Sequence, residues 1–419
     1  MEISRPETQL LLCCARTVKS PDTAARIRAL LQEGIDWEYL LRAAHRHQMA
    51  SLLYWHLDAV CSDAVPESAF EHLRDHFHAN SLRNLFLTGE LLRLLDAFKL
   101  QGIPAIPYKG SALAVSVYGN LALRNFNDLD ILVHRSDVPR AREVLTSLGY
   151  QARYRLAGTQ EAAFLRSQRE LSFRRDDGKS IVELQWGVVE KHFFPLDTER
   201  LWDRLDRIPL GGNTVPNLLP EDMLLILCAH GARHVWERLQ WICDVSELIR
   251  VYQEEIRWER IVTQASALGS KRMLLLGLFL ASDLLGAALP ETVSQRVWAD
   301  PAVKALAERT CEQMFQYTDR SAELFLEGDE GAPAFHILHL KIRERWWDKI
   351  CYCARKATTL RGEDLELLQL PKILFPFYYV LRLFRLTQKY GPRILKRLLC
   401  SEESRKRLPG SLKRGLVGS

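Results

Sequence analysis

Two aspartates separated by one residue, Asp128 and Asp130, begin the segment DLDILV. The apolar and β-branched residues that follow predict a buried strand, along which alternate side chains leave the same face. Two carboxylates held side by side repel each other, so one takes up a proton unless a cation lies between them. Magnesium, which binds carboxylates together with substrate phosphates, removes that conflict. The alternative is a surface Asp-Leu-Asp turn without a function.

A candidate phosphate-binding turn precedes the aspartates, in the segment YKGSALAVSVYG (108–119). Gly110 and Ser111 stand where a short apolar run changes into a helical pattern. Glycine permits close backbone approach there, and N–H groups at a helix start can receive phosphate oxygens. Lys109 and Arg124 would either neutralise phosphate charge or pair with the aspartates. A phosphate-binding turn beside two carboxylates is the minimum that nucleotidyl transfer requires. In that reaction two metal ions bind the attacking and leaving oxygens.

A third carboxylate is expected on a neighbouring strand. Glu183 in SIVELQW (180–186) is the best candidate, because Val182, Leu184 and Trp186 would occupy the opposite, core face. In such a site the third acid shares one metal and helps to deprotonate the acceptor hydroxyl. The alternative is that Glu183 belongs to the solvated face of its strand.

This combination resembles the DNA polymerase beta-like nucleotidyltransferase superfamily. Within it, the chain is most similar to the uncharacterised bacterial nucleotidyltransferase family proteins. The resemblance rests on a helical lead-in, the LKG-like turn at 108–110, an arginine shortly before the aspartates, and the segment HGARHVWERLQWICDV (230–245). It covers about residues 70–250, and the remainder loosely.

The resemblance implies roles for individual residues. Gly110 and Ser111, with Lys109, would hold the triphosphate of a nucleotide such as ATP, and two Mg²⁺ ions would be bound by Asp128, Asp130 and Glu183. The chain departs from its relatives in a longer gap between Ser111 and Asp128, and in Gln185, where relatives tend to carry histidine. Neither departure removes a metal ligand.

His230 and His234 lie four residues apart, a spacing that zinc ligands also use. The metalloprotease pattern H-E-x-x-H is not met, since Gly231 follows His230. We expect these histidines instead to form a polar network with Arg233, Arg238 and Asp244 where the helical part packs on the core. His234 and Arg238 would then contact the nucleotide from the far wall of the cleft.

The elements that position these residues predict an α+β fold, mostly helical, with a small mixed sheet. The expected divisions are a helical segment (1–100), the nucleotidyltransferase core (101–212), a helical domain (213–370) and a basic amphipathic tail (371–419) whose end is disordered. The main predicted elements are a helix over 66–102, a strand over 128–133, a helix over 137–150, a hairpin over 171–189 with an Asp-Asp-Gly-Lys turn, and helices over 221–252, 256–268, 270–288, 301–317 and 335–359.

Charge is distributed unevenly along the chain. Residues 371–419 hold 12 Lys and Arg against two acids, whereas the first 370 residues hold 45 basic and 50 acidic residues. The amphipathic segment 372–400 would therefore meet an anionic membrane surface or a protein, or pack on the helical domain; nucleic acid is a further option. The nine scattered cysteines predict reduced thiols and a cytoplasmic protein, with peripheral contact at the inner membrane face as an option.

We therefore expect a magnesium-dependent nucleotidyltransferase whose acceptor is a hydroxyl-bearing small molecule, a peptide or an RNA end. The alternative is a non-catalytic adaptor that retains the fold and docks through its basic tail.

Overall fold

The computed structural model describes residues 5–154, 158–315, 333–360 and 377–382, together with residues 384 and 388. The chain forms two compact units, Met1–Arg155 with Gln168–Tyr352, and Leu156–Ser167 with Cys353–Ser419. All candidate site residues belong to the first unit. The predicted basic tail (371–419), including the end that was predicted to be disordered, lies mostly outside the described residues. No described helix is long and apolar enough to cross a bilayer.

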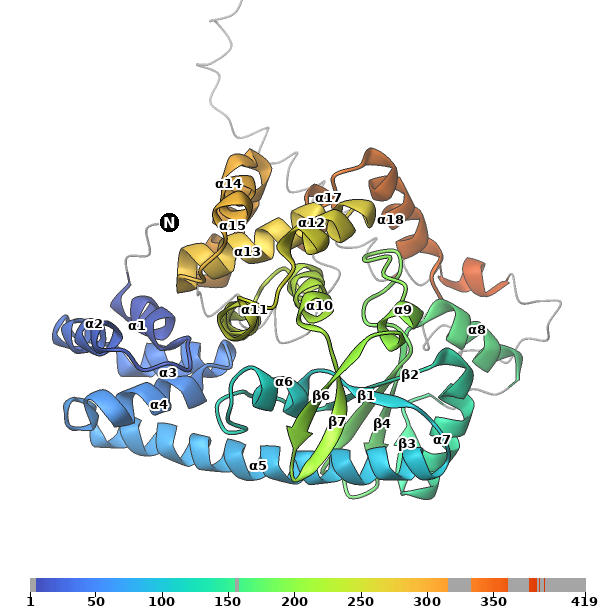
Figure 1. Cartoon of the computed structure of the whole chain (residues 1–419), viewed down its shortest axis with the longest axis horizontal. Helices are drawn as coiled ribbons and strands as arrows, with labels where there is room; N and C mark the ends of the chain where they lie inside the picture. Colours follow the sequence, from blue (N-terminus) through green and yellow to red (C-terminus); the bar gives the residue numbers. More distant parts are fainter. Residues whose placement is uncertain are drawn as a thin grey trace, which may run out of the picture. The chain divides into compact units, whose positions relative to one another are not determined.

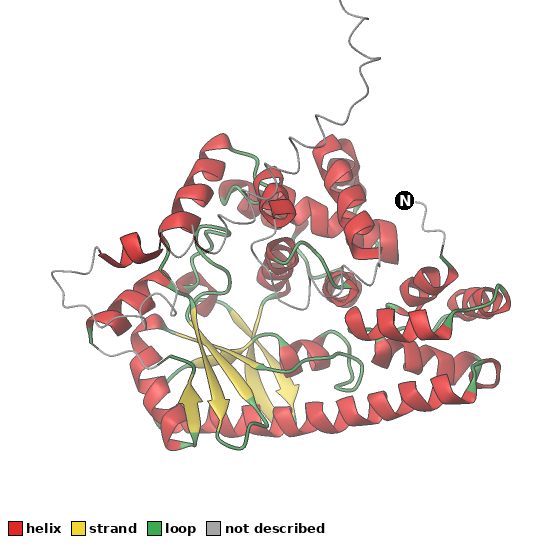
Figure 2. Cartoon of the chain, turned by 180° about the vertical axis from the view of Figure 1, so that it is seen from behind, coloured by secondary structure: helices red, strands yellow, loops and turns green. Residues whose placement is uncertain are grey.

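The first unit is built around a five-stranded sheet of order β1-β2-β5-β4-β3 (Figure 2). Only β2 and β5 run parallel; the other neighbours are antiparallel. The strands are β1 (Ala105–Pro107), β2 (Leu129–Val133), β3 (Tyr150–Ala152), β4 (Glu170–Arg175) and β5 (Ile181–Gln185). The predicted α+β class, the strand over 128–133 and the hairpin with its polar turn are thus confirmed.

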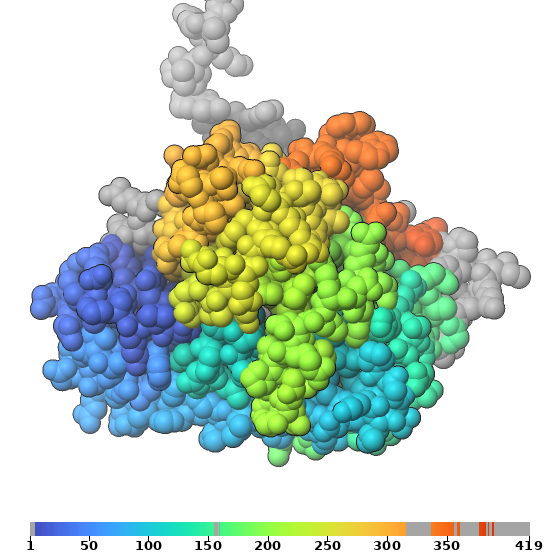
Figure 3. Space-filling view, in the orientation of Figure 1, coloured from blue at the N-terminus to red at the C-terminus, as the bar shows by residue number. Residues whose placement is uncertain are grey.

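A second sheet is the hairpin of β6 (Leu205–Leu210) and β7 (Asn213–Leu218). Strand β7 follows residue 212, the predicted end of the α/β core. The turn of this hairpin contacts helix α5 (Glu67–Leu100): a Cβ placed on Gly211 would lie 2.8 Å from Leu92 Cδ1. Figure 3 shows the hairpin on the surface beside this helix.

The N-terminal helical segment ends in α5, which spans 34 residues and confirms the helix predicted over 66–102. Its end is marked by Gly102, whose positive φ of 63° suits glycine at a helix C-terminus. The segment consists of α1 (Pro6–Cys14), α2 (Pro21–Gln32), α3 (Trp37–Arg46), α4 (Ala50–Val60), the 3₁₀ turn η1 (Ser62–Ala64) and α5 (Glu67–Leu100).

The remaining helical segments follow α5 in the chain (Figure 1). They are α6 (Gly110–Ser116), η2 (Arg135–Asp137), α7 (Val138–Ser147), α8 (Thr159–Ser167, in the second unit), α9 (Glu199–Trp202), α10 (Pro220–Arg233), α11 (Leu239–Tyr252), α12 (Trp258–Ala267), α13 (Lys271–Leu285), α14 (Glu291–Ala299), α15 (Pro301–Phe315), α17 (Pro333–Lys341) and α18 (Trp346–Thr358).

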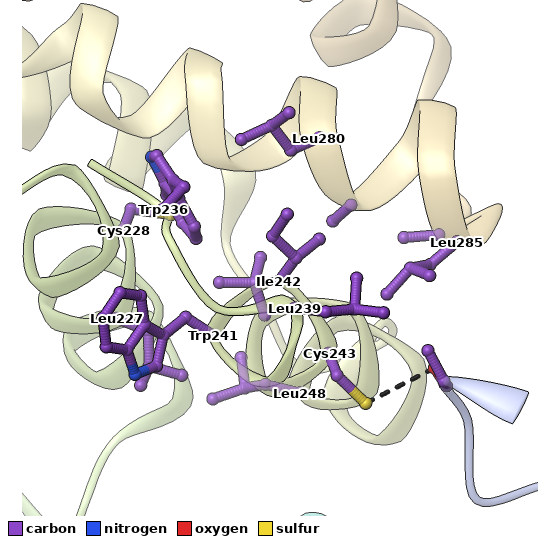
Figure 4. Packing of buried hydrophobic residues seen from close by; sticks show 14 of the residues in the cluster. Leu227, Cys228, Trp236, Leu239, Trp241, Ile242, Cys243, Leu248, Leu280 and Leu285 are labelled. Carbon is purple, nitrogen blue, oxygen red and sulfur yellow. Dashed lines mark hydrogen bonds between the residues drawn. The ribbon is translucent and has the colours of Figure 1, made fainter. Parts of the chain in front are cut away.

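The helix predicted over 221–252 is wrong in one respect, because it is broken between α10 and α11. Val235 and Trp236 adopt positive φ values of 50° and 56° in the break. Trp236 is fully buried, and its ring fills space that two glycines leave open: an added Cβ would lie 2.4 Å from it at Gly231 and 3.1 Å at Gly277. Burial of this indole among α10, α11 and α13 outweighs the local helical pattern (Figure 4).

The helix predicted over 335–359 is likewise divided, into α17 and α18. Arg343 lies in the gap and is 2% exposed. Its guanidinium donates to the carbonyl oxygens of His339 and His192, at 3.0 and 3.1 Å. A buried guanidinium needs such acceptors, so the interruption coincides with a polar anchor that the periodicity of the sequence does not reveal.

Candidate active site

The two predicted acidic strands lie next to each other. Parallel pairing of β2 and β5 places Asp130 opposite Glu183 and Leu132 opposite Gln185. Asp128 immediately precedes β2 and lies two residues before Asp130, on the same side of the chain. The structure therefore brings together the three carboxylates that the sequence singled out.

Gln185 connects two of these carboxylates. Its amide Nε2 donates to Asp130 Oδ1 at 2.5 Å and to Glu183 Oε2 at 3.1 Å. Its carbonyl oxygen accepts from the Tyr108 hydroxyl and from Arg169 Nη1, the latter at 3.2 Å. Because two donors occupy that oxygen, the amide is oriented with its N–H groups toward the acids. Gln185 is completely buried, so these bonds have no competition from water.

Cations lie on either side of the acids. Lys109 Nζ is 3.8 Å from Asp130 Oδ2 and is 12% exposed. Arg169 pairs with Glu170 at 2.6 Å, and its Nε lies 3.6 Å from Glu190. Glu170 pairs in register with Gln185 across β4 and β5, so it occupies the same sheet face as Glu183. The site is thus a mainly acidic face bordered by two buried or half-buried cations.

The acids are held in a setting that disfavours their charged forms. Burial raises the pKa of Asp128, and the neighbouring Asp130 charge raises it further. Burial also raises the pKa of Glu183, followed in effect by the charge of Glu170 and then by those of the two aspartates. Lys109 opposes both shifts without cancelling them. The single positive charge of Lys109 does not neutralise these carboxylates, so a further cation would stabilise their charged forms.

The Gly110-Ser111 turn lies against the start of β2. Gly110 has a φ of +45°, and a Cβ there would lie 3.5 Å from the Asp128 carbonyl oxygen. The side chain of Ser111 is buried, and its hydroxyl oxygen is hydrogen-bonded to that of Thr88 on α5, 2.9 Å away. What the turn offers to a ligand is its backbone, in the short helix α6.

Helix α5 also holds the loop that leads from α6 to the aspartates. Asn84 Nδ2 donates to the carbonyl oxygens of Leu121 and Arg124, at 2.6 and 2.8 Å. Asn80 Nδ2 donates to the Ala122 carbonyl oxygen at 2.9 Å. Asn80, Asn84 and Thr88 were not predicted, although polar residues every four positions on an otherwise apolar helix face are a usable signal.

Arg124 is engaged in a buried ion pair. Its Nε and Nη2 donate to the two carboxylate oxygens of Asp244 on α11, at 2.8 and 2.9 Å. The Tyr118 hydroxyl also donates to Asp244, at 2.6 Å. Of the two roles that the sequence allowed for Arg124, pairing with an acid is the one present here, although the acid is Asp244 and not an aspartate of β2.

His230 and His234 lie close together at the end of α10, with ring centroids 4.7 Å apart, and both contact Trp241. Burial lowers the pKa of His230 well below its usual range, and the Lys109 charge is the next largest cause. The charge of Lys109, which lies beside Asp130, therefore acts on His230 as well. Arg233 Nη1 donates to His234 Nε2 at 2.6 Å, and Arg233 also pairs with Glu190 at 2.8 Å.

Arg238 precedes α11, and its guanidinium carbon lies 5.5 Å from the centre of the Trp241 ring. The predicted polar network of this region is therefore divided. Asp244 joins Arg124, while the histidines and Arg238 cluster around Trp241. The side chains of His230, His234 and Arg238, like that of Arg233, are partly buried.

Among the described residues, no group of three or more His, Cys, Asp or Glu side chains forms a ready-made metal site. The donor set nevertheless fits a hard cation: it consists of carboxylate oxygens whose protonation is favoured because they are buried and repel one another. Asp128, Asp130 and Glu183 form an open set that phosphate oxygens would complete.

The family model for uncharacterised nucleotidyltransferases matches residues 33–286. The chain belongs to this family. The match extends from the N-terminal helices, through the sheet and both acidic strands, to the end of α13. Comparisons with curated proteins and with solved structures found no match.

In this nucleotidyltransferase family member, the matched region contains every predicted site residue, together with Arg169, Glu170 and Thr88, which were not predicted. The hairpin register signals Glu170: counting back from the Asp-Asp-Gly-Lys turn places it opposite Gln185. Arg169 has no comparable signal, because its partners Glu190 and Gln185 come from different segments.

Proposed function

We propose that the chain transfers a nucleoside monophosphate from a nucleoside triphosphate such as ATP to a hydroxyl-type acceptor, in a magnesium-dependent reaction. The observation that carries this proposal is the side-by-side placement of Asp130 and Glu183 on parallel strands, with Asp128 beside them and Lys109 Nζ 3.8 Å from Asp130. The finer assignment to the polymerase beta-like superfamily is part of the same proposal.

Asp128, Asp130 and Glu183 would hold two magnesium ions, which when bound neutralise the acids and polarise the phosphate oxygens. Lys109 would bind the triphosphate, and backbone N–H groups of Gly110 and Ser111 would approach it. The acceptor oxygen forms a bond to the α-phosphorus, the bond to the leaving pyrophosphate breaks, and a carboxylate oxygen of Glu183 takes the hydroxyl proton. His234 and Arg238, which border the buried Trp241 ring, would contact the base from the opposite side.

The test compares the wild type with the Asp128→Asn and Asp130→Asn double variant. We expect incubation with α-labelled triphosphates and a cell lysate to label an acceptor in the wild type only, and calorimetry with magnesium and nucleotide to give heat in the wild type only. Asp206→Asn, an exposed aspartate on β6, is the matched control. Unchanged transfer or unchanged magnesium-dependent nucleotide binding in the double variant would refute the proposal.

The lysate experiment also identifies the acceptor class. Label in a small-molecule, protein or RNA fraction separates the three candidates. A wild-type protein that gives neither metal-dependent heat nor labelling would act as an adaptor.

A further inference from the structure

The outward face of α5 carries a regular stripe of exposed residues. Its positions are 75, 79, 82, 86, 89, 93 and 96, and all of them are exposed. The spacing alternates between four and three residues, which is the a/d repeat of a coiled-coil seam. From 75 to 96 the seam extends about 32 Å at 1.5 Å per residue.

The centre of the stripe is apolar. Leu82 is 70% exposed and Phe86 41% exposed, and Leu85 beside them is 63% exposed. Gly89, one turn further, has no atom within 4 Å of the position that a Cβ would take. Three large apolar side chains next to an open glycine form a contiguous patch on a helix whose other face is already buried.

The stripe is complementary to itself when it is reversed. If a second α5 runs antiparallel with its two-fold axis at residue 84, position i faces position 168 − i. Leu82 then faces Phe86, and the small residues at positions 79 (alanine) and 89 (glycine) face each other. Asp75 faces Arg93, which joins opposite charges. These are the layers of an antiparallel coiled coil, in which each a position packs against a d position.

Both charged residues are available for this pairing. The Asp75 side chain is 76% exposed and its contact with Arg74 is 3.6 Å long. Arg93 is 40% exposed and pairs with Glu90 at 2.5 Å. A guanidinium has five N–H donors, so Arg93 keeps Glu90 while it donates to a second acid.

We propose that this chain forms a homodimer in which two α5 helices pack antiparallel along residues 75–93 of the stripe. Among the occupants that this face could take, a second copy is selected by the reversal symmetry: the apolar pair lies at the axis and the opposite charges lie at equal distances from it. Such an interface is isologous and closes at two subunits. Because the inner face of the same helix holds Asn80, Asn84 and Thr88, the dimer also braces the loop that positions Asp128.

The first experiment measures the mass of the full chain in solution by sedimentation and light scattering over a range of concentrations. We expect a dimer for the wild type and a dissociation constant raised by about tenfold or more for the variant Leu82→Glu with Phe86→Glu, since each charge would be buried at the seam. Trp298→Glu, on α14 and 48% exposed, is the control and should leave the mass unchanged. Circular dichroism verifies that every variant is folded.

The second experiment tests the register by charge reversal. Asp75→Arg alone should weaken the dimer, because it would face Arg93 of the other copy, and adding Arg93→Asp should restore it. A wild type that is monomeric at every concentration overturns the proposal. So does a dimer that the Leu82→Glu and Phe86→Glu variant leaves intact. Failure of a folded double-reversal variant to restore the dimer overturns the antiparallel register.

Discussion

At the scale of single residues, the acidic face combines charges that oppose folding with groups that hold them in place. Asp128 and Glu183 both have raised pKa values, caused first by burial and then by neighbouring carboxylates. An acid whose pKa is raised on folding contributes stability at low pH, and that contribution is lost as the pH rises through the raised pKa. The metal-free protein should therefore lose stability between the ordinary carboxyl range and neutral to mildly alkaline pH.

Asp128→Asn removes one of these charges. We expect the free energy of unfolding of the metal-free protein to increase by about 1 kcal/mol at mildly alkaline pH, the equivalent of about one pKa unit, and to change little at pH values below the ordinary carboxyl range. Chemical denaturation at several pH values measures this. A variant that is less stable than the wild type at high pH would contradict the repulsion argument.

Gln185 positions two carboxylates through one neutral amide. Gln185→Leu should weaken Mn²⁺ binding by about tenfold, because Asp130 and Glu183 lose their common donor. Tyr108→Phe removes only one bond to the amide oxygen and should have a smaller effect in the same direction. Metal titration and the pH profile of binding test this. If Gln185→Leu lowers the melting temperature but leaves both readouts unchanged, its role is only structural.

At the scale of elements, the break between α10 and α11 divides one apolar helical run into two helices and places the partly buried side chains of His234 and Arg238 between them. The break depends on the Trp236 ring, which occupies the space above Gly231 and Gly277. No residue within the run disrupts the helical pattern strongly, so the break results from tertiary packing.

Gly231→Ala would place a methyl group 2.4 Å from the Trp236 ring. We expect a loss of about 1–3 kcal/mol in stability, as for overpacked cores. Trp236→Phe in the same chain should recover part of that loss, because the smaller ring frees the space. Thermal unfolding of the two single variants and the double variant gives the coupling energy. Additive losses in the double variant would show that Gly231 is not needed to make space for the Trp236 indole.

At the scale of the first unit, the Arg124–Asp244 pair links the loop before β2 to α11, across 120 residues of sequence. Both side chains are buried, at 7% and 1% exposure. Removing one partner of such a pair leaves an uncompensated buried charge.

Arg124→Met should therefore cost about 3–5 kcal/mol, whereas Arg124→Met with Asp244→Leu should be considerably less destabilising. Denaturant unfolding measures both, and Arg42→Met, at an ion pair with Glu38 in which the side chains are 44% and 83% exposed, is the control with an expected cost of about 0–1 kcal/mol. Equal losses in the single and double variants would contradict this account.

Short-range patterns in the sequence determined a large part of this protein. Apolar and β-branched content predicted the strand that carries Asp130, alternation predicted the strand that carries Glu183, and the polar turn at 176–179 predicted the hairpin. The 3.6-residue period predicted α5 almost to its ends. These features follow from backbone geometry and from which face of an element is apolar. Both can be recognised from the residues of a few helical turns or of one strand.

Only the tertiary structure decided which segments meet. Each of these contacts joins residues from separate segments: Asp130 pairs in register with Glu183, and Arg124 forms an ion pair with Asp244. Tyr108 and Arg169 orient Gln185, and the helix break at Trp236 depends on glycines of two helices. Strand partners and buried ion pairs are chosen by the packing of the whole core, in which a buried polar group must find its partner wherever the chain supplies one. The acidic pair is thus readable in sequence, but the site that surrounds it is a product of the fold.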